Sequence, residues 1–591
     1  MIITTLNKKI IQCIEELFAS FNIPEDKIHL VLTKKEFEGD ITLVLFPLIR
    51  FVKKPIHELG DEIGNILVEK DEFDSFNVVS GFLNLVVSDS YINTLFENIY
   101  SNSDFGIPDF KDIPHPISLV EFSSPNTNKP LHLGHIRNIL LGQSISNILE
   151  KMGHLVKRVQ VINDRGIHIC KSMLAWQKFG NGDTPSKNKM KGDFFVGKYY
   201  ILFEKKFQEE KAKLIKSGLN QEEAIKKSVL LNEAKQMLIN WENEDVETRK
   251  LWEKMNNWVY QGFNQTYTDL GVSFDKNYYE SQTYLLGKKI VKKGLLDQIF
   301  FKKEDNSVWI DLKDLGLDEK LLLRSDGTAV YMTQDIGTAL ERYNDFNFDN
   351  LIYVTGNEQD YHFSTLFKVL SKLGYKWSKN CFHLSYGMVN LPDGKMKSRE
   401  GTVVDADTLI QKMRKDSRLI IKNSNKLDDY TDEEVNLLSN KIGDAALKYF
   451  ILKIDANKNM MFNPSESIDF NGNTGPFIQY SYARIKSILR RKIDFKPIFY
   501  SDKKSSLEER ELLKSILDYP MVIIDSGNAK NPSLLANYIY QLAKLYNKFY
   551  QKIIILDGSK DENYRLAISK KVAEIIKEGM SILGMDVPEK M

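Results

Sequence analysis

Apolar residues recur in three different rhythms along the chain, and the first, up to about residue 110, mixes helical and strand-like spacing. Ile10, Ile14 and Leu17 share one face of a predicted opening helix, and the stretches 41–46 and 77–87 are strand-like. This mixture predicts a small α+β domain over residues 1–110. Prolines gather in the stretch 107–116, which indicates a linker.

From residue 117 to about 400, short apolar runs alternate with helical spacing. The runs 117–122, 156–162 and 352–354 indicate buried strands, and helical patterns follow from about 135 and over 361–373. Strand and helix in alternation predict a parallel, doubly wound sheet, with ligands at the carboxyl ends of its strands. Residues 180–320 interrupt this rhythm, and their charged middle predicts an insertion with a solvated face.

From about residue 435 onward the spacing is almost entirely helical. Apolar and aromatic residues recur at steps of three and four, for example at Leu534, Tyr538, Leu542 and Phe549. The predicted fold is therefore α/β, with a Rossmann-type doubly wound parallel sheet in residues 111–430. The N-terminal α+β domain precedes this sheet, and an all-α helical bundle in residues 431–591 follows it.

Composition narrows this picture only slightly. A chain of 591 residues is too long for one core, and 81 Lys and Arg against 80 Asp and Glu argue neither for nor against nucleic acid. Cys13, Cys170 and Cys381 lie far apart and make no metal-binding or disulfide pattern, which predicts a reducing cytoplasm and no metal held by the protein itself. Neither a signal peptide nor a membrane-length apolar run is present, so we expect no membrane association.

The stretch 121–137 carries the most specific chemistry. It runs from a strand through a loop with two prolines into the start of a helix, where His132, Gly134 and His135 form a His-x-Gly-His. A helix start offers backbone N–H groups to an anion, and a glycine lets a flat base approach the backbone. A helix N-terminus with two surface histidines is the alternative reading of this short motif.

Taken with more distant strings, this stretch resembles the class I aminoacyl-tRNA synthetases. The His-Leu-Gly-His is similar to their first signature, and Lys-Met-Lys-Ser-Arg at 395–399 is similar to their second. The strings at 121–126, 323–336, 475–484 and 587–591 resemble the arginyl-tRNA synthetase family in particular, and the resemblance runs almost end to end.

The resemblance implies a two-step reaction. ATP, with Mg²⁺, activates L-arginine to arginyl-adenylate, and the arginyl group then passes to the 3′ end of tRNA(Arg). It also implies an N-terminal domain that contacts the tRNA elbow at the D-loop and a C-terminal domain that binds the anticodon. Nothing in the sequence suggests an obligate dimer, so we expect a cytoplasmic monomer.

For ATP, the resemblance implies phosphate and base contacts in both signatures. Ser398 stands where the second signature normally has its second lysine, and Lys129, just ahead of the first signature, is expected to take over that charge. Lys397 or Arg399 could share that charge with Lys129 and Lys395, or both could be solvated loop charges. The implied ATP site is His132, Gly134, His135, Lys129, Lys395, Met396, Lys397 and Ser398, with catalytic roles for His132, His135, Lys129 and Lys395.

For arginine, the resemblance implies acidic and polar side chains, which suit the five donors of a guanidinium. Asp335 and Tyr331, four residues apart and so on one face of a helix, would line the pocket. Glu121 and Asn126 would hold the α-amino end, and Gln359 would also contact arginine. His362 either approaches the nucleotide or is simply packed.

For tRNA, the implied contacts are Asn84 near the D-loop and Tyr546, Tyr550 and Met591 near the anticodon. Aromatic rings stack on single-stranded bases, but core packing explains aromatics in a helical bundle equally well. Two further residues, Tyr480 and Arg484, could support the domain joint instead of touching RNA.

Four other functions compete with this one. A cysteinyl enzyme would need zinc-binding cysteines, and a glutamyl enzyme would need a basic pocket in place of Glu121 and Asp335. A non-catalytic RNA-binding paralogue would not need the intact histidines, although Ser398 leaves it open. A small-molecule nucleotidyltransferase could share the His-x-Gly-His but would not need so large a helical C-terminal domain.

Overall fold

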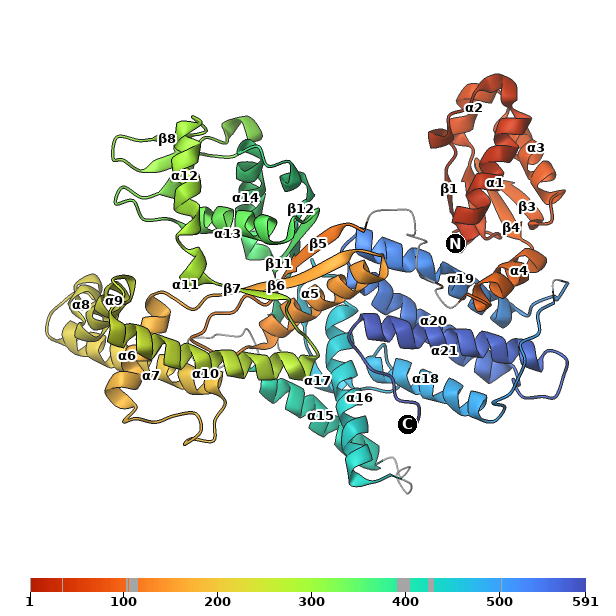
Figure 1. Ribbon diagram of the computed structural model, residues 1–591. Coiled ribbons are helices and arrows are strands. Elements are labelled where there is room, and N and C mark those ends of the chain that lie inside the picture. Colours follow the sequence, from red (N-terminus) through yellow and green to blue (C-terminus); the bar gives the residue numbers. More distant parts are fainter. Residues whose placement is uncertain are drawn as a thin grey trace.

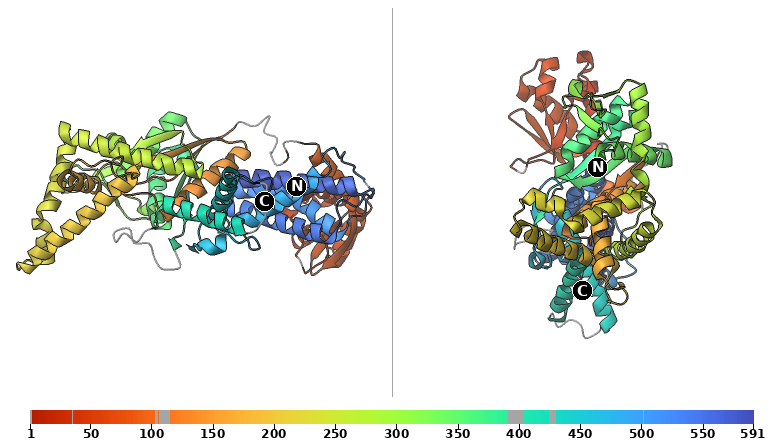
Figure 2. Two further views of the ribbon diagram at one scale, coloured as in Figure 1. Left: turned by 90° about the horizontal axis from the view of Figure 1, so that it is seen from below. Right: turned by 90° about the vertical axis from the view of Figure 1, so that its left-hand side faces the viewer.

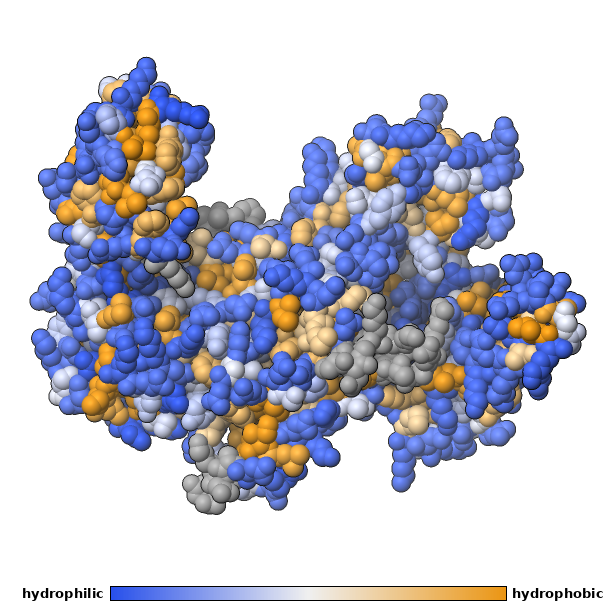
Figure 3. Space-filling view, turned by 180° about the vertical axis from the view of Figure 1, so that it is seen from behind, coloured by the Kyte–Doolittle hydropathy of each residue, from blue (hydrophilic) through white to orange (hydrophobic). Residues whose placement is uncertain are grey.

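The computed structural model describes residues 2–34, 36–102, 105, 115–390, 404–423, 430–500 and 502–591. These residues form an N-terminal domain, a central parallel sheet with its helices, and a C-terminal helical bundle (Figure 1). The molecule is elongated, with the helices α7–α10 at one end and the N-terminal domain at the other (Figure 2). Seen from behind, the N-terminal domain and the lobe around β8 rise from a common base with a broad concave surface between them (Figure 3).

The N-terminal domain is a four-stranded antiparallel sheet with helices against it. The strand order is β1-β2-β4-β3. One strand was predicted over 77–87, but the structure has a hairpin there, because Ser80 and Gly81 both take the left-handed backbone region and turn the chain. Its elements are α1 (Ile2–Leu17), β1 (Leu30–Leu32), β2 (Ile41–Val44), α2 (Phe46–Val52), α3 (Ile56–Val68), β3 (Phe73–Val79), β4 (Phe82–Val87) and α4 (Asp89–Tyr100).

The central sheet confirms the predicted parallel architecture. All four strand pairs are parallel, in the order β12-β11-β5-β6-β7. The order reverses between β5 and β11, which is the point at which such sheets bind ligands beyond the carboxyl ends of their strands. The strands are β5 (Ile117–Glu121), β6 (Leu155–Ile162), β7 (Lys276–Tyr279), β11 (Asn350–Gly356) and β12 (Cys381–Tyr386). The helices α5 (Leu133–Lys151), α6 (Ile167–Phe179), α13 (Tyr331–Phe346) and α14 (Asp360–Lys372) connect them.

The segment predicted as one insertion over about 180–320 contains a strand of this sheet. β7 pairs in parallel with β6 and divides the segment into a helical part and a part with its own small sheet. The helices are α7 (Gly192–Lys216), α8 (Gln221–Lys227), α9 (Val229–Glu242) and α10 (Val246–Leu270). After β7 come α11 (Glu280–Thr283), α12 (Leu286–Leu296) and the antiparallel strands β8 (Phe300–Lys302), β9 (Val308–Ile310) and β10 (Lys320–Leu323).

The C-terminal part is helical, as predicted. Its helices are α15 (Ala406–Asn423), α16 (Asp432–Leu452), α17 (Pro464–Ser467), α18 (Gly475–Arg490), α19 (Leu507–Asn528), α20 (Pro532–Lys552) and α21 (Glu562–Ile582). The short strands β13 (Val389–Asn390) and β14 (Met460–Met461) pair beside it. Among the residues that the structure describes, no helix is long and apolar enough to cross a membrane.

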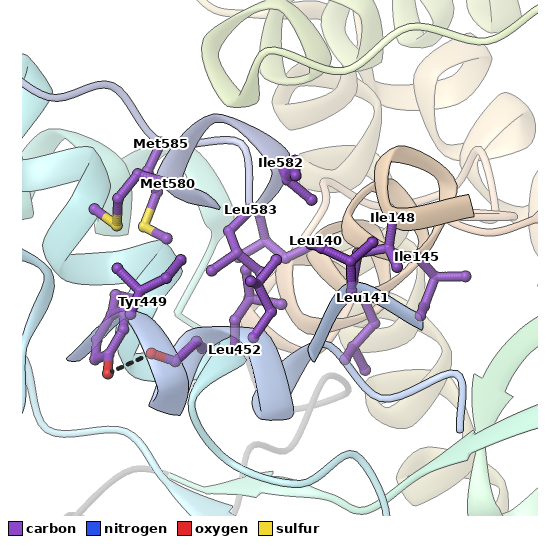
Figure 4. Close-up of a cluster of buried hydrophobic side chains, with 14 of the residues drawn as sticks. Leu140, Leu141, Ile145, Ile148, Tyr449, Leu452, Met580, Ile582, Leu583 and Met585 are labelled. Atoms are coloured by element: carbon purple, nitrogen blue, oxygen red, sulfur yellow. Dashed lines mark hydrogen bonds between the residues drawn. The ribbon is translucent and has the colours of Figure 1, made fainter. Parts of the chain in front are cut away.

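One apolar cluster joins the helical bundle to the sheet. Leu140, Ile145 and Ile148 of α5 pack near Leu452 of α16 and Leu583, just after α21 (Figure 4). The same helix carries the His-x-Gly-His at its start. Burial of several large aliphatic side chains at ~1.5–3 kcal/mol each therefore fixes the position of the motif relative to the bundle.

Candidate active site

The largest cavity near the sequence motifs lies at the carboxyl ends of β5 and β6. Its volume is 880 Å³. Its wall combines the loop after β5, the start of α5, the turn after β6, and residues from α7, α11 and α13. The lining includes Asn126, Lys129, His132, Arg165, Lys198, Glu280, Tyr331 and Asp405. A cavity at this place in a doubly wound sheet is the expected ligand site.

The two histidines of the motif stand together at the start of α5. His132 is the N-cap residue, and its backbone N–H donates to Nδ1 of His135 over 3.1 Å. Their ring centroids are 3.9 Å apart. Because Nδ1 of His135 accepts a hydrogen bond, a neutral His135 carries its proton on Nε2, which is left as a donor. Gly134 is the second residue of α5, beside them.

The protonation states of His132, His135 and Lys129 are compatible with a bound anion. Burial, with the Lys129 ammonium as a further cause, lowers the pKa of His132 to about 4, and burial also holds the pKa of His135 well below its ordinary value. Burial lowers the pKa of Lys129 as well. Nδ1 of His132 is buried and has no hydrogen-bond partner within the described part of the chain. Two neutral imidazoles and one lysine at a helix N-terminus are therefore the groups that an incoming phosphate would meet.

The second signature lies outside the described residues, and with it Lys395, Met396, Lys397 and Ser398. The chain that follows it is anchored at the first signature. The Ala406 N–H donates to the Leu131 carbonyl over 2.9 Å, and the Leu133 N–H donates to the Val404 carbonyl over 3.3 Å. Val404 and Ala406 therefore lie beside the first signature.

Asp335 and Tyr331 occupy the first turns of α13, on one face, as predicted. Tyr331 lines the cavity and is 77% exposed. Oδ2 of Asp335 is 2.6 Å from Nε2 of His362, so His362 orients this carboxylate. Gln359 ends the short 3-10 helix η4 (Asn357–Gln359), just beyond the carboxyl end of β11, and is exposed. Three of the five predicted arginine contacts, Tyr331, Asp335 and Gln359, thus come from segments at the carboxyl edge of the sheet.

Glu280 is a second carboxylate at this site that the sequence analysis missed. It lines the cavity directly after β7. Burial raises the pKa of Glu280 to about 7, and the carboxylates of Asp164 and Asp335 add to that rise. The position of Glu280 in the sequence could have indicated its role, because a polar residue at the carboxyl end of a parallel strand lies at the ligand-binding edge of the sheet. The strand β7, which ends just before Glu280, was not predicted.

Glu121, predicted to hold the α-amino end of arginine, is buried in the structure. It is 8% exposed, and both of its carboxylate oxygens are engaged within the protein. Oε2 lies 2.7 Å from Nη1 of Arg342, and Oε1 accepts from Oγ of Ser124 over 2.9 Å. Asn126, predicted as its neighbour in the site, is exposed and lines the cavity.

A second cavity, of 410 Å³, lies in the helical bundle. Its wall combines aromatic rings with a few polar side chains from α18 and α20 and with the C-terminal Met591. The guanidinium of Arg484 lies 4.8 Å from the ring centre of Tyr480 and 5.1 Å from that of Tyr550. The lining includes Tyr430, Phe470, Phe477, Tyr480, Arg484, Asn547, Gln551 and Met591. The sequence analysis had Tyr480 and Arg484 as possible joint residues, whereas the structure puts both in this cavity.

Two of the predicted tRNA contacts, Tyr546 and Asn84, are buried in the structure. Tyr546 is 0% exposed, and its hydroxyl donates to Oγ of Ser569 over 3.1 Å inside the bundle core. Asn84 is 2% exposed; its side chain accepts from Thr42 and donates to Asn77 across β2, β4 and β3. Both side chains are hydrogen-bonded within the fold, and their contacts with tRNA stay predictions.

Two family descriptions match this chain. Residues 114–463 match "tRNA synthetases class I (R), catalytic domain", and residues 478–591 match "DALR anticodon binding domain". Among curated relatives, the arginine--tRNA ligase of Flavobacterium psychrophilum is 51% identical over 601 residues and covers 99% of both chains. That of Bacteroides fragilis is 50% identical over 577 residues, with 96% of each chain covered.

Solved structures agree in fold. The Thermus thermophilus arginyl-tRNA synthetase superposes with a TM-score of 0.81 at 22% identity and covers 100% of both chains. The Plasmodium falciparum arginyl-tRNA synthetase superposes with a TM-score of 0.75 at 20% identity, covering 100% of this chain and 99% of that one. The whole chain, including its N-terminal domain, therefore has the fold of these structures.

Proposed function

Because the chain belongs to the arginyl-tRNA synthetase family, we propose that it forms arginyl-adenylate from arginine and ATP in the 880 Å³ cavity at the carboxyl edge of the sheet. As a class I arginine--tRNA ligase, the chain activates L-arginine with ATP and transfers it to tRNA(Arg). The arrangement that supports this site is a phosphate-compatible corner at Lys129, His132 and His135, with the carboxylates of Asp335 and Glu280 at the same edge of the sheet.

In the first step an oxygen of the arginine carboxylate attacks the α-phosphorus of ATP, and pyrophosphate leaves. His135, through Nε2–H, and His132 donate to phosphate oxygens as charge develops on them, and the N-terminus of α5 adds its dipole. Lys129 shares the pyrophosphate charge with Lys395 and with Lys397 or Arg399 of the second signature. Gly134 leaves room for the adenine, with Met396 and Ser398 in the same nucleotide site.

In the second step a hydroxyl of the terminal ribose of tRNA attacks the arginyl carbonyl, and AMP leaves. Arginine stays in place through both steps. Its guanidinium pairs with Asp335 and lies against Tyr331, because a planar fork of donors matches a carboxylate and stacks on an aromatic ring. Asn126 and Gln359 hold the α-amino and carboxyl end near ATP.

Glu280 gives this site a testable pH dependence. A carboxyl whose pKa is raised to about 7 is mostly neutral at pH 6 and mostly charged at pH 8. A cationic side chain binds the charged form better, so the arginine KM should fall by about tenfold between pH 6 and pH 8, while the ATP KM stays constant. Steady-state pyrophosphate exchange across this range measures both. Glu280→Gln should flatten the arginine profile; an unchanged slope in that variant would assign the pH dependence elsewhere.

For tRNA, we propose that an anticodon base enters the 410 Å³ cavity of the bundle. Its aromatic walls would stack the base, and Arg484, Asn547 and Gln551 would bond its edge. Met591 and Tyr550 keep their predicted roles in this proposal. The N-terminal domain, residues 1–110, would contact the tRNA elbow, with the catalytic domain over 111–430 and the anticodon domain over 431–591.

Tyr550→Ala tests the anticodon assignment. Loss of one base-stacking ring costs ~1–3 kcal/mol, so the KM for tRNA in aminoacylation should rise roughly tenfold to hundredfold. Tyr546→Phe is the matched control, four residues away on the same helix. It removes only a buried hydroxyl, and the KM for tRNA should not change. Equal effects of the two substitutions on tRNA would indicate that the first acts by disturbing the bundle.

Mg²⁺ is proposed to enter with the triphosphate, held mainly by phosphate oxygens and water. Among the described residues, no three His, Cys, Asp or Glu side chains gather as metal ligands would. We further propose that the enzyme acts as a cytoplasmic monomer.

Charging of unfractionated tRNA from a related bacterium tests the proposed function as a whole. With ATP and Mg²⁺, radiolabelled arginine should enter acid-precipitable tRNA, and each of the other amino acids should not. Incorporation of a different amino acid, or of none, would contradict it.

A further inference from the structure

Glu121 ends the central strand β5 directly below the loop that leads to the first signature. Its carboxylate is held from two sides, by Nη1 of Arg342 at 2.7 Å and by Oγ of Ser124 at 2.9 Å. It is 8% exposed and is not among the residues that line the 880 Å³ cavity, so it lies behind the cavity wall. Its charge is already balanced by an arginine of the protein.

Arg342 is an unusual residue to bury. It is 1% exposed, and the rings of Tyr278 and Tyr353 lie 5.3 and 5.5 Å from its guanidinium carbon. Nε and Nη2 have no hydrogen-bond partner among the described residues, so Glu121 is the carboxylate that compensates its charge. A buried ion pair of this kind contributes little to stability compared with apolar packing. Its clearest effect is therefore to hold the carboxylate of Glu121 in one place.

The second contact of Glu121, with Ser124, holds the loop that follows β5. Ser123 and Ser124 have φ values of 69° and 44°, in the left-handed region that non-glycine residues adopt only at a cost. Oγ of Ser124 donates to Glu121 and also accepts from the Val161 N–H over 3.1 Å. This hydroxyl therefore holds the strained turn against both β5 and β6.

The turn at Ser123 and Ser124 sets the position of Asn126. Asn126 follows two residues after Ser124, forms a parallel bridge with Asn163, and lines the large cavity. Arg342 lies seven residues after Asp335 on α13, so both are on one face of the helix, Arg342 deep and Asp335 near the cavity side. One helix thus carries the carboxylate assigned to arginine and, two turns later, the cation that pairs with Glu121.

We propose that Arg342 is a positioning residue of the arginine site, which acts through Glu121 and Ser124 to fix the loop that presents Asn126. In this arrangement Glu121 links Arg342 to the loop. The inference rests on the proposed assignment of Asn126 and Asp335 to arginine.

Arg342→Met removes the charge and keeps the length of the side chain. We expect the arginine KM to rise roughly tenfold to hundredfold, as is typical when the group that orients a ligand-binding residue is lost, and the ATP KM to stay within about twofold. Asp345→Asn is the matched control on the same helix, since Asp345 accepts from the Tyr278 hydroxyl and Lys276 but does not touch Glu121. It should leave both KM values unchanged.

The double variant Arg342→Met, Glu121→Gln separates positioning from general damage. Glutamine no longer leaves a buried unpaired charge, so it should recover part of the arginine affinity lost in Arg342→Met. Ser124→Ala breaks the same chain of contacts, Arg342–Glu121–Ser124, at its other end. This variant replaces Arg342→Met as the test if Arg342→Met does not fold. It should raise the arginine KM and spare the ATP KM.

Equal changes in both KM values, or a change in neither, would overturn the inference in whichever of these variants folds. Asp335→Asn distinguishes this from failure of the proposed function. If Asp335→Asn raises the arginine KM and the variants of this chain of contacts do not, only the positioning role is wrong. If Asp335→Asn also leaves arginine binding unchanged, the site itself is misassigned.

Discussion

Asp335→Asn should raise the arginine KM by about 100-fold and leave the ATP KM within about twofold. The guanidinium of arginine carries its charge at every accessible pH, and its five donors need acceptors. Asparagine has nearly the same shape as aspartate and can still bond His362, but it replaces the charge and one acceptor with a donor. Loss of one partner of a desolvated charge pair costs about 3 kcal/mol, which corresponds to about two orders of magnitude in affinity.

Pyrophosphate exchange at varied arginine and at varied ATP measures this prediction. Asp345→Asn, ten residues further along α13, is again the control and should behave as the unsubstituted enzyme. A normal arginine KM in Asp335→Asn would mean that the guanidinium lies elsewhere, with Glu280 and Asp405 as the carboxylates that line the cavity.

Lys129→Ala should lower the rate of adenylate formation by ~10²–10³-fold with little change in either KM. The charge on pyrophosphate develops as it leaves, and removal of one positioned donor for developing charge typically costs ~3–4 kcal/mol. Burial already lowers the pKa of this lysine, so its ammonium is poorly solvated in the free enzyme and gains most when the phosphates arrive. Single-turnover adenylate formation measures the step directly.

Lys397→Ala is the comparison for Lys129→Ala, because both lysines are candidates for the charge that Ser398 does not supply. It should reduce the rate only slightly. Mild and equal losses in the two variants would mean that the phosphate charge is shared evenly, and that Lys129 does not replace the missing lysine of the second signature.

The sequence predicted those parts of the fold whose pattern is long enough to be unambiguous. The strand, loop and helix of residues 117–151 carry an uninterrupted apolar strand, two loop prolines and several helical repeats, and the structure confirms all three. β7 was missed because its four residues are too short to show a period, and the missed Glu280 followed from that. The hairpin at 77–87 was predicted as one strand because its turn, Ser80-Gly81, is only two residues long.

Only those parts of the site whose residues are close together in the sequence could be predicted. His132, His135 and Lys129 share one loop, and the structure brings them together as expected. The roles of Asn84 and Tyr546 depend on which way a side chain faces, and a polar residue in a sheet or an aromatic residue in a bundle has no pattern that separates core from surface. The Glu121–Arg342 pair joins β5 to α13 across the fold, so no local pattern could indicate it.

The measurement that tests the account most directly is amino-acid-dependent exchange of pyrophosphate into ATP, with and without tRNA(Arg). Arginine should support exchange, most strongly with tRNA present, as the family resemblance implies. Citrulline, which has the same shape without the charge, should not. Exchange with citrulline at a comparable KM, with another amino acid, or with none under either condition would contradict a carboxylate-based arginine site beside the histidine motif.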